Sequence, residues 1–146
     1  MSNEKYIYYV EGDNEKKLIN TLKSELKVIK SGKVVKLNIT NQKLTNDKLM
    51  RLKQNTTVVL VFDVDGNNTD ILTDNINTLK NCKIINNIVF LMQVNNLEDE
   101  LVSACNIESP FEITGADSYK MHKRNFNNIS NLAEKLLKYD FNIDKL

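Results

Sequence analysis

Hydrophobic residues recur along the chain in two alternating patterns. Short runs rich in β-branched and aromatic residues predict four strands, at residues 6–10, 34–39, 57–62 and 88–92. Apolar residues at helical spacing predict three intervening helices, at residues 16–29, 45–53 and 70–79. Strands that alternate with helices in this way form a mostly parallel sheet with right-handed crossovers and helices on both faces.

The chain after the fourth strand is less regular. Residues 97–105 predict a helix, and residues 126–139 predict a closing helix. Between them, weak periodicity together with Pro110 and Gly115 predicts a loop or a short edge element over 107–125. The expected fold is therefore a compact, Rossmann-like α/β domain of about four parallel strands with a C-terminal helix, and residues 1–146 are expected to form one domain.

Acidic residues follow two of the predicted strands. The runs at 57–62 and 88–92 are almost continuously apolar, which is typical of strands buried in a parallel sheet. The first of them ends in Asp63-Val64-Asp65, and Glu11 directly follows the strand at 6–10. Because α/β proteins bind ligands at the carboxyl ends of their strands, we expect Glu11, Asp63 and Asp65 at one edge of the sheet.

These acids suggest a metal site. Residues two apart on an extended backbone project to the same side, so Asp63 and Asp65 can present two carboxylates to one cation. Magnesium takes one or two protein carboxylates and fills its other positions with water or phosphate oxygens. The alternatives are that the Asp pair opens an ordinary Asp-Gly turn, and that Glu11 and Glu15 only offset a helix dipole.

Two segments resemble a known family. The segment Tyr9-Val10-Glu11-Gly12-Asp13-Asn14-Glu15 is similar to the first motif of Toprim domains, and Phe62-Asp63-Val64-Asp65-Gly66 is similar to their D-x-D motif. The resemblance covers about residues 5–105 and leaves 106–146 as a C-terminal extension. It implies a Toprim fold in which Glu11 acts as general acid/base or metal ligand, while Asp63 and Asp65 hold Mg²⁺ or Mn²⁺.

The nearest branch is the nucleases of the overcoming-lysogenization-defect type. Residues 96–101 resemble the L-E segment of that branch, which implies that Glu98 joins a second metal position with Glu15 as its companion. Lys123-Arg124-Asn125-Phe126 resembles its late Lys, which stabilises charge at the scissile phosphate. The alternatives are that Glu98 is a solvated acid at a helix start and that Lys123 contacts a phosphate backbone or solvent.

Several departures narrow the function. The chain has no G-x-x-x-x-G-K-[ST] loop of an attached ATPase, no clearly presented tyrosine nucleophile and no zinc module, which disfavours topoisomerase and primase activity. We therefore expect a metal-dependent nuclease acting on DNA in preference to RNA, in phage defence or DNA repair. A non-catalytic module that binds nucleic acid or protein is the alternative, and a receiver-like phosphotransfer domain fits poorly. Assembly as a homodimer or with a partner protein stays open.

Composition adds few constraints. The chain has 20 Lys and Arg against 19 Asp and Glu, so any nucleic-acid contact must come from a local patch. Cys82 and Cys105 are isolated and His122 is the only histidine, so neither a zinc site nor a redox pair is expected. No apolar run approaches the roughly 20 residues that span a bilayer, and the N-terminal segment lacks a signal-peptide pattern. We expect a cytoplasmic protein.

Overall fold

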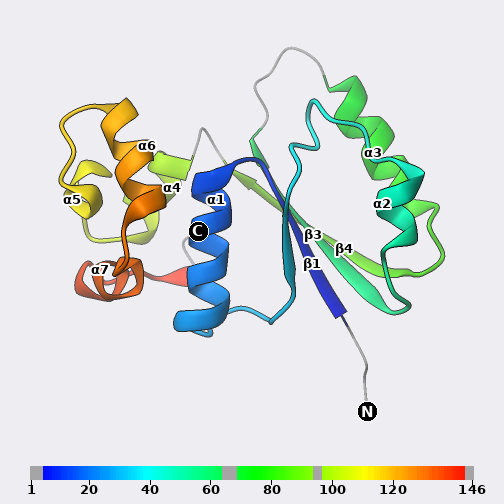
Figure 1. The fold of residues 1–146 in the computed structure, drawn as a ribbon, viewed down its shortest axis with the longest axis horizontal. Coiled ribbons are helices and arrows are strands. Elements are labelled where there is room, and N and C mark those ends of the chain that lie inside the picture. The colour runs from blue at the N-terminus through cyan, green and yellow to red at the C-terminus, as the bar shows by residue number, and fades with distance from the viewer. Residues whose placement is uncertain (1–4, 64–68, 94–96, 144–146) are drawn as a thin grey trace.

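The computed structural model describes residues 5–63, 69–93 and 97–143. Its centre is an all-parallel sheet with the strand order β2-β1-β3-β4 (Figure 1). The strands are β1 (Lys5–Val10), β2 (Lys33–Lys36), β3 (Thr56–Asp63) and β4 (Ile85–Gln93). Helices flank the sheet on both faces, so the predicted fold class is confirmed.

The helices form layers on either side of the sheet. Those that precede β4 are α1 (Asp13–Asn20), the π-helical turn η1 (Thr21–Glu25), α2 (Asn46–Met50) and α3 (Asp70–Lys80). Those that follow it are α4 (Leu97–Ala104), α5 (Phe111–Thr114), α6 (Tyr119–Asn128) and α7 (Leu132–Lys138). Helices α2 and α3 cover one face of the sheet, α1 covers the other, and α4 to α7 lie beyond α1 (Figure 1). No described helix is long and apolar enough to cross a membrane.

Two apolar clusters hold these layers together, because successive side chains of a strand point to opposite faces. Leu60 and Phe62 of β3 pack with α2, α3 and the chain after β2, whereas Val59 and Val61 pack on the α1 side. The cluster on the α1 side also contains buried residues from the C-terminal part of the chain, namely Ile113, Phe126, Leu132 and Leu136. The segment after residue 105 therefore shares a core with the sheet.

The prediction of a loop or a short edge element over 107–125 is wrong. This stretch contains α5 and most of α6, and the residues that suggested a loop mark the ends of these helices. Pro110 precedes α5, and Gly115 ends it with a left-handed φ of 68°, which glycine adopts without strain. The Ser118 side chain then caps α6 by accepting a hydrogen bond from the Met121 N–H.

The predicted closing helix over 126–139 is also divided. Helix α6 ends at Asn128, and α7 begins at Leu132 after a break at Ile129, where ψ is 130°. The predicted helix over 16–29 likewise ends early, because η1 stops at Glu25. Apolar residues recur through both helix breaks because the residues at the breaks still pack against the apolar cluster on the α1 side of the sheet.

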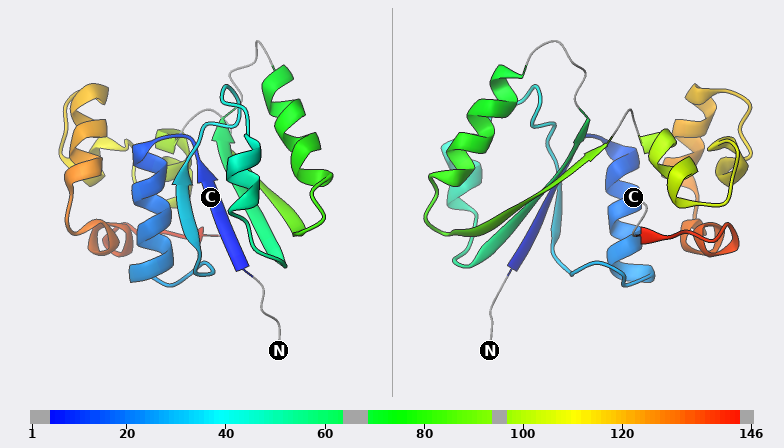
Figure 2. Two further views of the ribbon diagram at one scale, coloured as in Figure 1. Left: turned by 45° about the vertical axis from the view of Figure 1, so that its right-hand side comes forward. Right: turned by 180° about the vertical axis from the view of Figure 1, so that it is seen from behind.

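The last strand is not buried as its apolar sequence suggested. In β4, the side chains of Phe90, Leu91 and Met92 are 46%, 41% and 61% exposed. The order of strands explains this, since β4 forms one edge of the described sheet. Seen from behind in Figure 2, β4 lies foremost and no helix crosses it. An apolar run therefore predicted the strand correctly without revealing its place in the sheet.

Candidate functional site

A cavity of about 430 Å³ lies at the carboxyl edge of the sheet. Five of the six predicted site residues line it, namely Glu11, Glu15, Asp63, Glu98 and Lys123. These residues are separated by up to 112 positions in sequence. The sixth predicted residue, Asp65, lies outside the described residues.

The sheet places the first acids side by side. Strands β1 and β3 are paired, with Val10 aligned with Val61. Glu11 follows β1 and Asp63 is the last residue of β3, so both leave adjacent strands at the same end. The sequence-based prediction that these two acids share one edge of the sheet is therefore consistent with the fold. Both are partly buried.

Glu15 is a partly buried acid at the start of α1, of which it is the third residue. Burial raises the pKa of Glu15, and the nearby Glu98 raises it further. The backbone amides of Glu15 and Gly12, together with Lys123, oppose this shift. Glu15 therefore lies close enough to the charged groups of the C-terminal helices to interact with them electrostatically.

Those helices supply the other wall of the cavity. Glu98 is buried in the first turn of α4, and Lys123 is exposed on α6, which packs against α1. Counting Asp13, five carboxylates and one ammonium group among the described residues line the cavity. This excess of negative charge at the edge of a parallel sheet favours binding of a cation.

Side-chain amides also line the cavity, and sequence reasoning missed them. They belong to Asn14, Asn38, Gln93 and Asn127. Gln93 ends β4 and is aligned with Asp63, and Asn38 follows β2 by two residues, so their positions after strands could have identified them. The Nδ2 of Asn14 is buried without a hydrogen-bond partner among the described residues. Amide groups can ligate a hard cation through oxygen or donate to phosphate.

The carboxylates share the cavity without forming a closed coordination shell. Across residues 5–63, 69–93 and 97–143, no three Asp, Glu, His or Cys side chains stand close enough to hold a metal ion together. An open site of this kind fits magnesium, which keeps several waters and binds through few carboxylates plus phosphate oxygens. Glu11, Glu15, Asp63 and Glu98 are the described acids of this cavity that the sequence motifs singled out as metal ligands.

His122 lies behind the cavity wall, in a packed aromatic environment. It is buried between the rings of Phe111 and Phe126, whose centroids are 5.8 and 5.9 Å away. Its Nδ1 is 2.9 Å from Thr114 Oγ1, while Nε2 has no hydrogen-bond partner among the described residues. Burial lowers the pKa of His122, with Glu98 opposing and Lys123 adding to this shift.

This environment predicts a loss of stability in acid. Because the folded chain holds His122 neutral, the unfolded chain binds more protons once the pH falls below the usual histidine pKa of about 6.5. The contribution of His122 to stability is therefore present above that pH and declines below it. We expect the free energy of unfolding of His122→Gln, measured by urea denaturation, to fall less than that of wild type between neutral pH and the folded-state pKa of His122. Equal slopes would show that His122 does not titrate on unfolding.

Comparisons with known proteins give no relative. No family model, no curated protein and no solved structure matches this chain. The resemblance to Toprim domains therefore depends on the two sequence motifs, and the candidate site depends on the geometry described above.

Proposed function

We propose that the acidic cavity binds a divalent cation, Mg²⁺ or Mn²⁺, and that the protein hydrolyses phosphodiester bonds in nucleic acid. One observation carries this proposal: Glu11, Glu15, Asp63, Glu98 and Lys123, chosen from sequence motifs, line one cavity at the functional edge of a parallel sheet. A role in a turn, at a helix start or in solvent, considered for each residue separately, gives no reason why these residues should line the same cavity. We propose DNA, in preference to RNA, as the substrate and the cytoplasm as the location.

Each residue has a proposed role. Asp63 and Glu11, with Asp65 from the same motif, would hold one ion, and Glu98 with Glu15 would hold a second. The bound ion would supply a nucleophilic water and neutralise charge on the phosphate. Glu11, partly buried beside Asp63, would also transfer protons as general acid/base. Lys123 would stabilise the negative charge that develops on the phosphate oxygens.

The test is a cleavage assay with a strict control. Purified protein is incubated with plasmid DNA, single-stranded DNA or structured RNA, in Mg²⁺, in Mn²⁺ or with EDTA. Asp63→Asn protein, purified in the same way, controls for contaminating nucleases. We expect cleavage that requires the metal and the wild-type protein. Metal-independent cleavage, or equal cleavage by Asp63→Asn, would contradict the proposal.

A non-catalytic module that binds nucleic acid or protein remains the second candidate. The observation that favours it is the absence, among the described residues, of three metal-binding side chains already gathered around one point. The two candidates differ in their response to metal. A metal site stabilises the folded chain by about 2.7 kcal/mol at a hundredfold excess of ion over its dissociation constant, whereas a module without one shows no specific stabilisation.

Glu15 offers a stability test of the same site. We expect Glu15→Gln to unfold at a higher temperature than wild type at neutral pH without metal, because burial disfavours the charged carboxylate. Since the folded-state pKa is raised, this advantage should shrink as the pH falls through that pKa and vanish below the ordinary glutamate value.

The control is Asp13→Asn in the same helix turn. Asp13 is exposed and pairs with Lys36 at 3.2 Å, so its replacement should not stabilise the protein. If Glu15 is also a metal ligand, Mg²⁺ should raise the melting temperature of wild type more than that of Glu15→Gln. A variant that melts below wild type at neutral pH would show that the charged form of Glu15 stabilises the fold.

A further inference from the structure

The exposed edge of the sheet has an unusual composition. Strand β4 has a paired neighbour only on its β3 side in the described sheet, and its nine residues include no charged side chain. The opposite edge, β2, begins and ends with Lys33 and Lys36. Charged residues on an edge strand discourage pairing with another chain, so β2 is protected and β4 is not.

The pattern of apolar and polar residues in β4 reads the same in both directions from Phe90. Residues 87–93 read Asn-Ile-Val-Phe-Leu-Met-Gln, five apolar residues between two amides. If two copies pair antiparallel with Phe90 at the centre, Ile88 faces Met92 of the second copy and Val89 faces Leu91. Asn87 then faces Gln93. Every apolar residue meets an apolar residue, and directly opposed apolar pairs are the unit of sheet stability.

The backbone direction agrees with this centre. The Ile88 N–H donates to the Asn87 side chain at 2.9 Å, so it points away from β3. Backbone groups of alternate residues in a strand point to the same side, which also directs those of Phe90 and Met92 outward. Phe90 of each copy can therefore exchange two hydrogen bonds with its counterpart. The Ile88 N–H would leave Asn87 for Met92 of the second copy.

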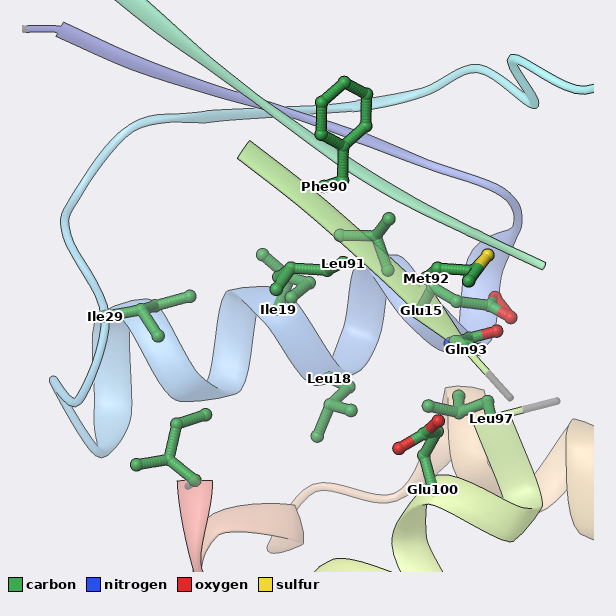
Figure 3. Close-up of a pocket in the computed structure, with 12 residues that line it drawn as sticks. Glu15, Leu18, Ile19, Ile29, Phe90, Leu91, Met92, Gln93, Leu97 and Glu100 are labelled. Atoms are coloured by element: carbon green, nitrogen blue, oxygen red, sulfur yellow. The ribbon is translucent and has the colours of Figure 1, made fainter. Parts of the chain in front are cut away.

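We propose that β4 pairs with β4 of a second copy around a two-fold axis at Phe90, forming one continuous eight-stranded sheet. The side of the strand that faces α1 supports this arrangement. There, a cavity of about 320 Å³ is lined by apolar side chains that include Leu18, Ile19 and Leu91 (Figure 3). Phe90 points away from Leu18 and Ile19, so the exposed apolar surface of β4 occupies both faces of the sheet.

The pairing predicts a reversible dimer. About seven residues per chain form the ladder, roughly 23 Å long at 3.3 Å per residue. Because this one ladder is the whole of the proposed contact, we expect a weak interface in which monomer and dimer exchange with concentration. The interface contains none of the residues to which we assign a catalytic or metal-binding role, and it meets the acidic cavity only at its end, where Gln93 lines both. Dimerisation can therefore be tested without metal.

Analytical ultracentrifugation over a wide range of protein concentration tests it. We expect wild type to dimerise, and Phe90→Lys to be monomeric because two ammonium groups would meet at the axis. Met92→Lys is a second variant at a more exposed position and should raise the dissociation constant at least about tenfold, since it buries a charge opposite Ile88. The control is Met50→Lys on α2, where the side chain is 80% exposed, and it should dimerise like wild type.

Hydrogen exchange identifies the surface involved. Protection of the Phe90 and Met92 amides should rise with protein concentration in wild type and stay low in Met92→Lys. Wild type that stays monomeric at the highest concentration would overturn the proposal. A dimer that persists in both lysine variants, or that is lost in Met50→Lys, would also overturn it, because association would then use another surface.

Discussion

Replacement of Asp63 by Asn is expected to reduce metal-dependent cleavage by about 10²–10³-fold, the scale of loss when one preorganised electrostatic group is removed. Asn keeps the size of the side chain and one oxygen but removes the charge that attracts a hard cation. Asp63 ends β3, where its backbone is fixed by pairing with Gln93, so the change should leave the fold intact. Turnover under saturating substrate, measured across a metal titration, gives the effect.

Asp74→Asn is the matched control for Asp63. Asp74 lies on α3, is exposed and approaches Lys43 at 4.0 Å, outside the acidic cavity. The control should cleave at the wild-type rate. If Asp63→Asn kept wild-type turnover while magnesium stabilised both proteins equally, Asp63 would have no part in metal binding. The nuclease proposal would then fail at its central residue.

Lys123→Ala is expected to lower turnover by about 10²-fold with little change in substrate affinity, if Lys123 stabilises the transition state. The structure places this lysine on α6, at the wall of the cavity that also contains Asp63. Within the part of the chain that the structure describes, no other cationic side chain lines this cavity. A contact made only with the nucleic-acid backbone would instead weaken binding and reduce its salt dependence by about one phosphate contact.

Lys120→Ala separates the two roles of a lysine on this helix. Lys120 is exposed on α6 one turn earlier and does not line the cavity. Single-turnover rates and binding constants for both variants, measured at several salt concentrations, distinguish catalysis from backbone contact. A Lys123→Ala variant that loses affinity but keeps its single-turnover rate would exclude the catalytic role.

The sheet and the edge at which the acids lie were predictable because they depend on local patterns. The apolar run 57–62 determines β3, and the acids that end it must lie at the carboxyl edge of a parallel sheet. Glu11 and Asp63 could therefore be brought together from sequence alone. Glu98 and Lys123 required the family resemblance, because nothing in the periodicity of α4 or α6 indicates which sheet edge those helices face.

The exposure of β4 and the helices of 107–125 could not be predicted for different physical reasons. An apolar strand looks the same whether it is central or at an edge, since its place depends on which other strand pairs with it. In 107–125, Pro110 and Gly115 are residue types found at helix ends as often as in loops. Helix α5 is also too short to show the helical periodicity of apolar residues. Asn38 was overlooked because the chain is rich in asparagine, although the positions of Asn38 and Gln93 relative to the strands could have identified both.

The shared core on the α1 side determines how this chain can be divided. The motif-bearing region ends near residue 105, yet Phe126 and Leu136, which follow it, are completely buried in the cluster that also supports β1 and β3. Two backbone hydrogen bonds also join the end of α4 to the segment after α7. Asn106 N–H donates to the Tyr139 carbonyl, and Asn142 N–H donates to the Ala104 carbonyl. A fusion or transplanted fragment that stops at residue 105 would carry both sequence motifs but neither the full core nor Lys123. Ile143 also packs against this cluster, so the smallest unit that keeps the whole core extends through residue 143.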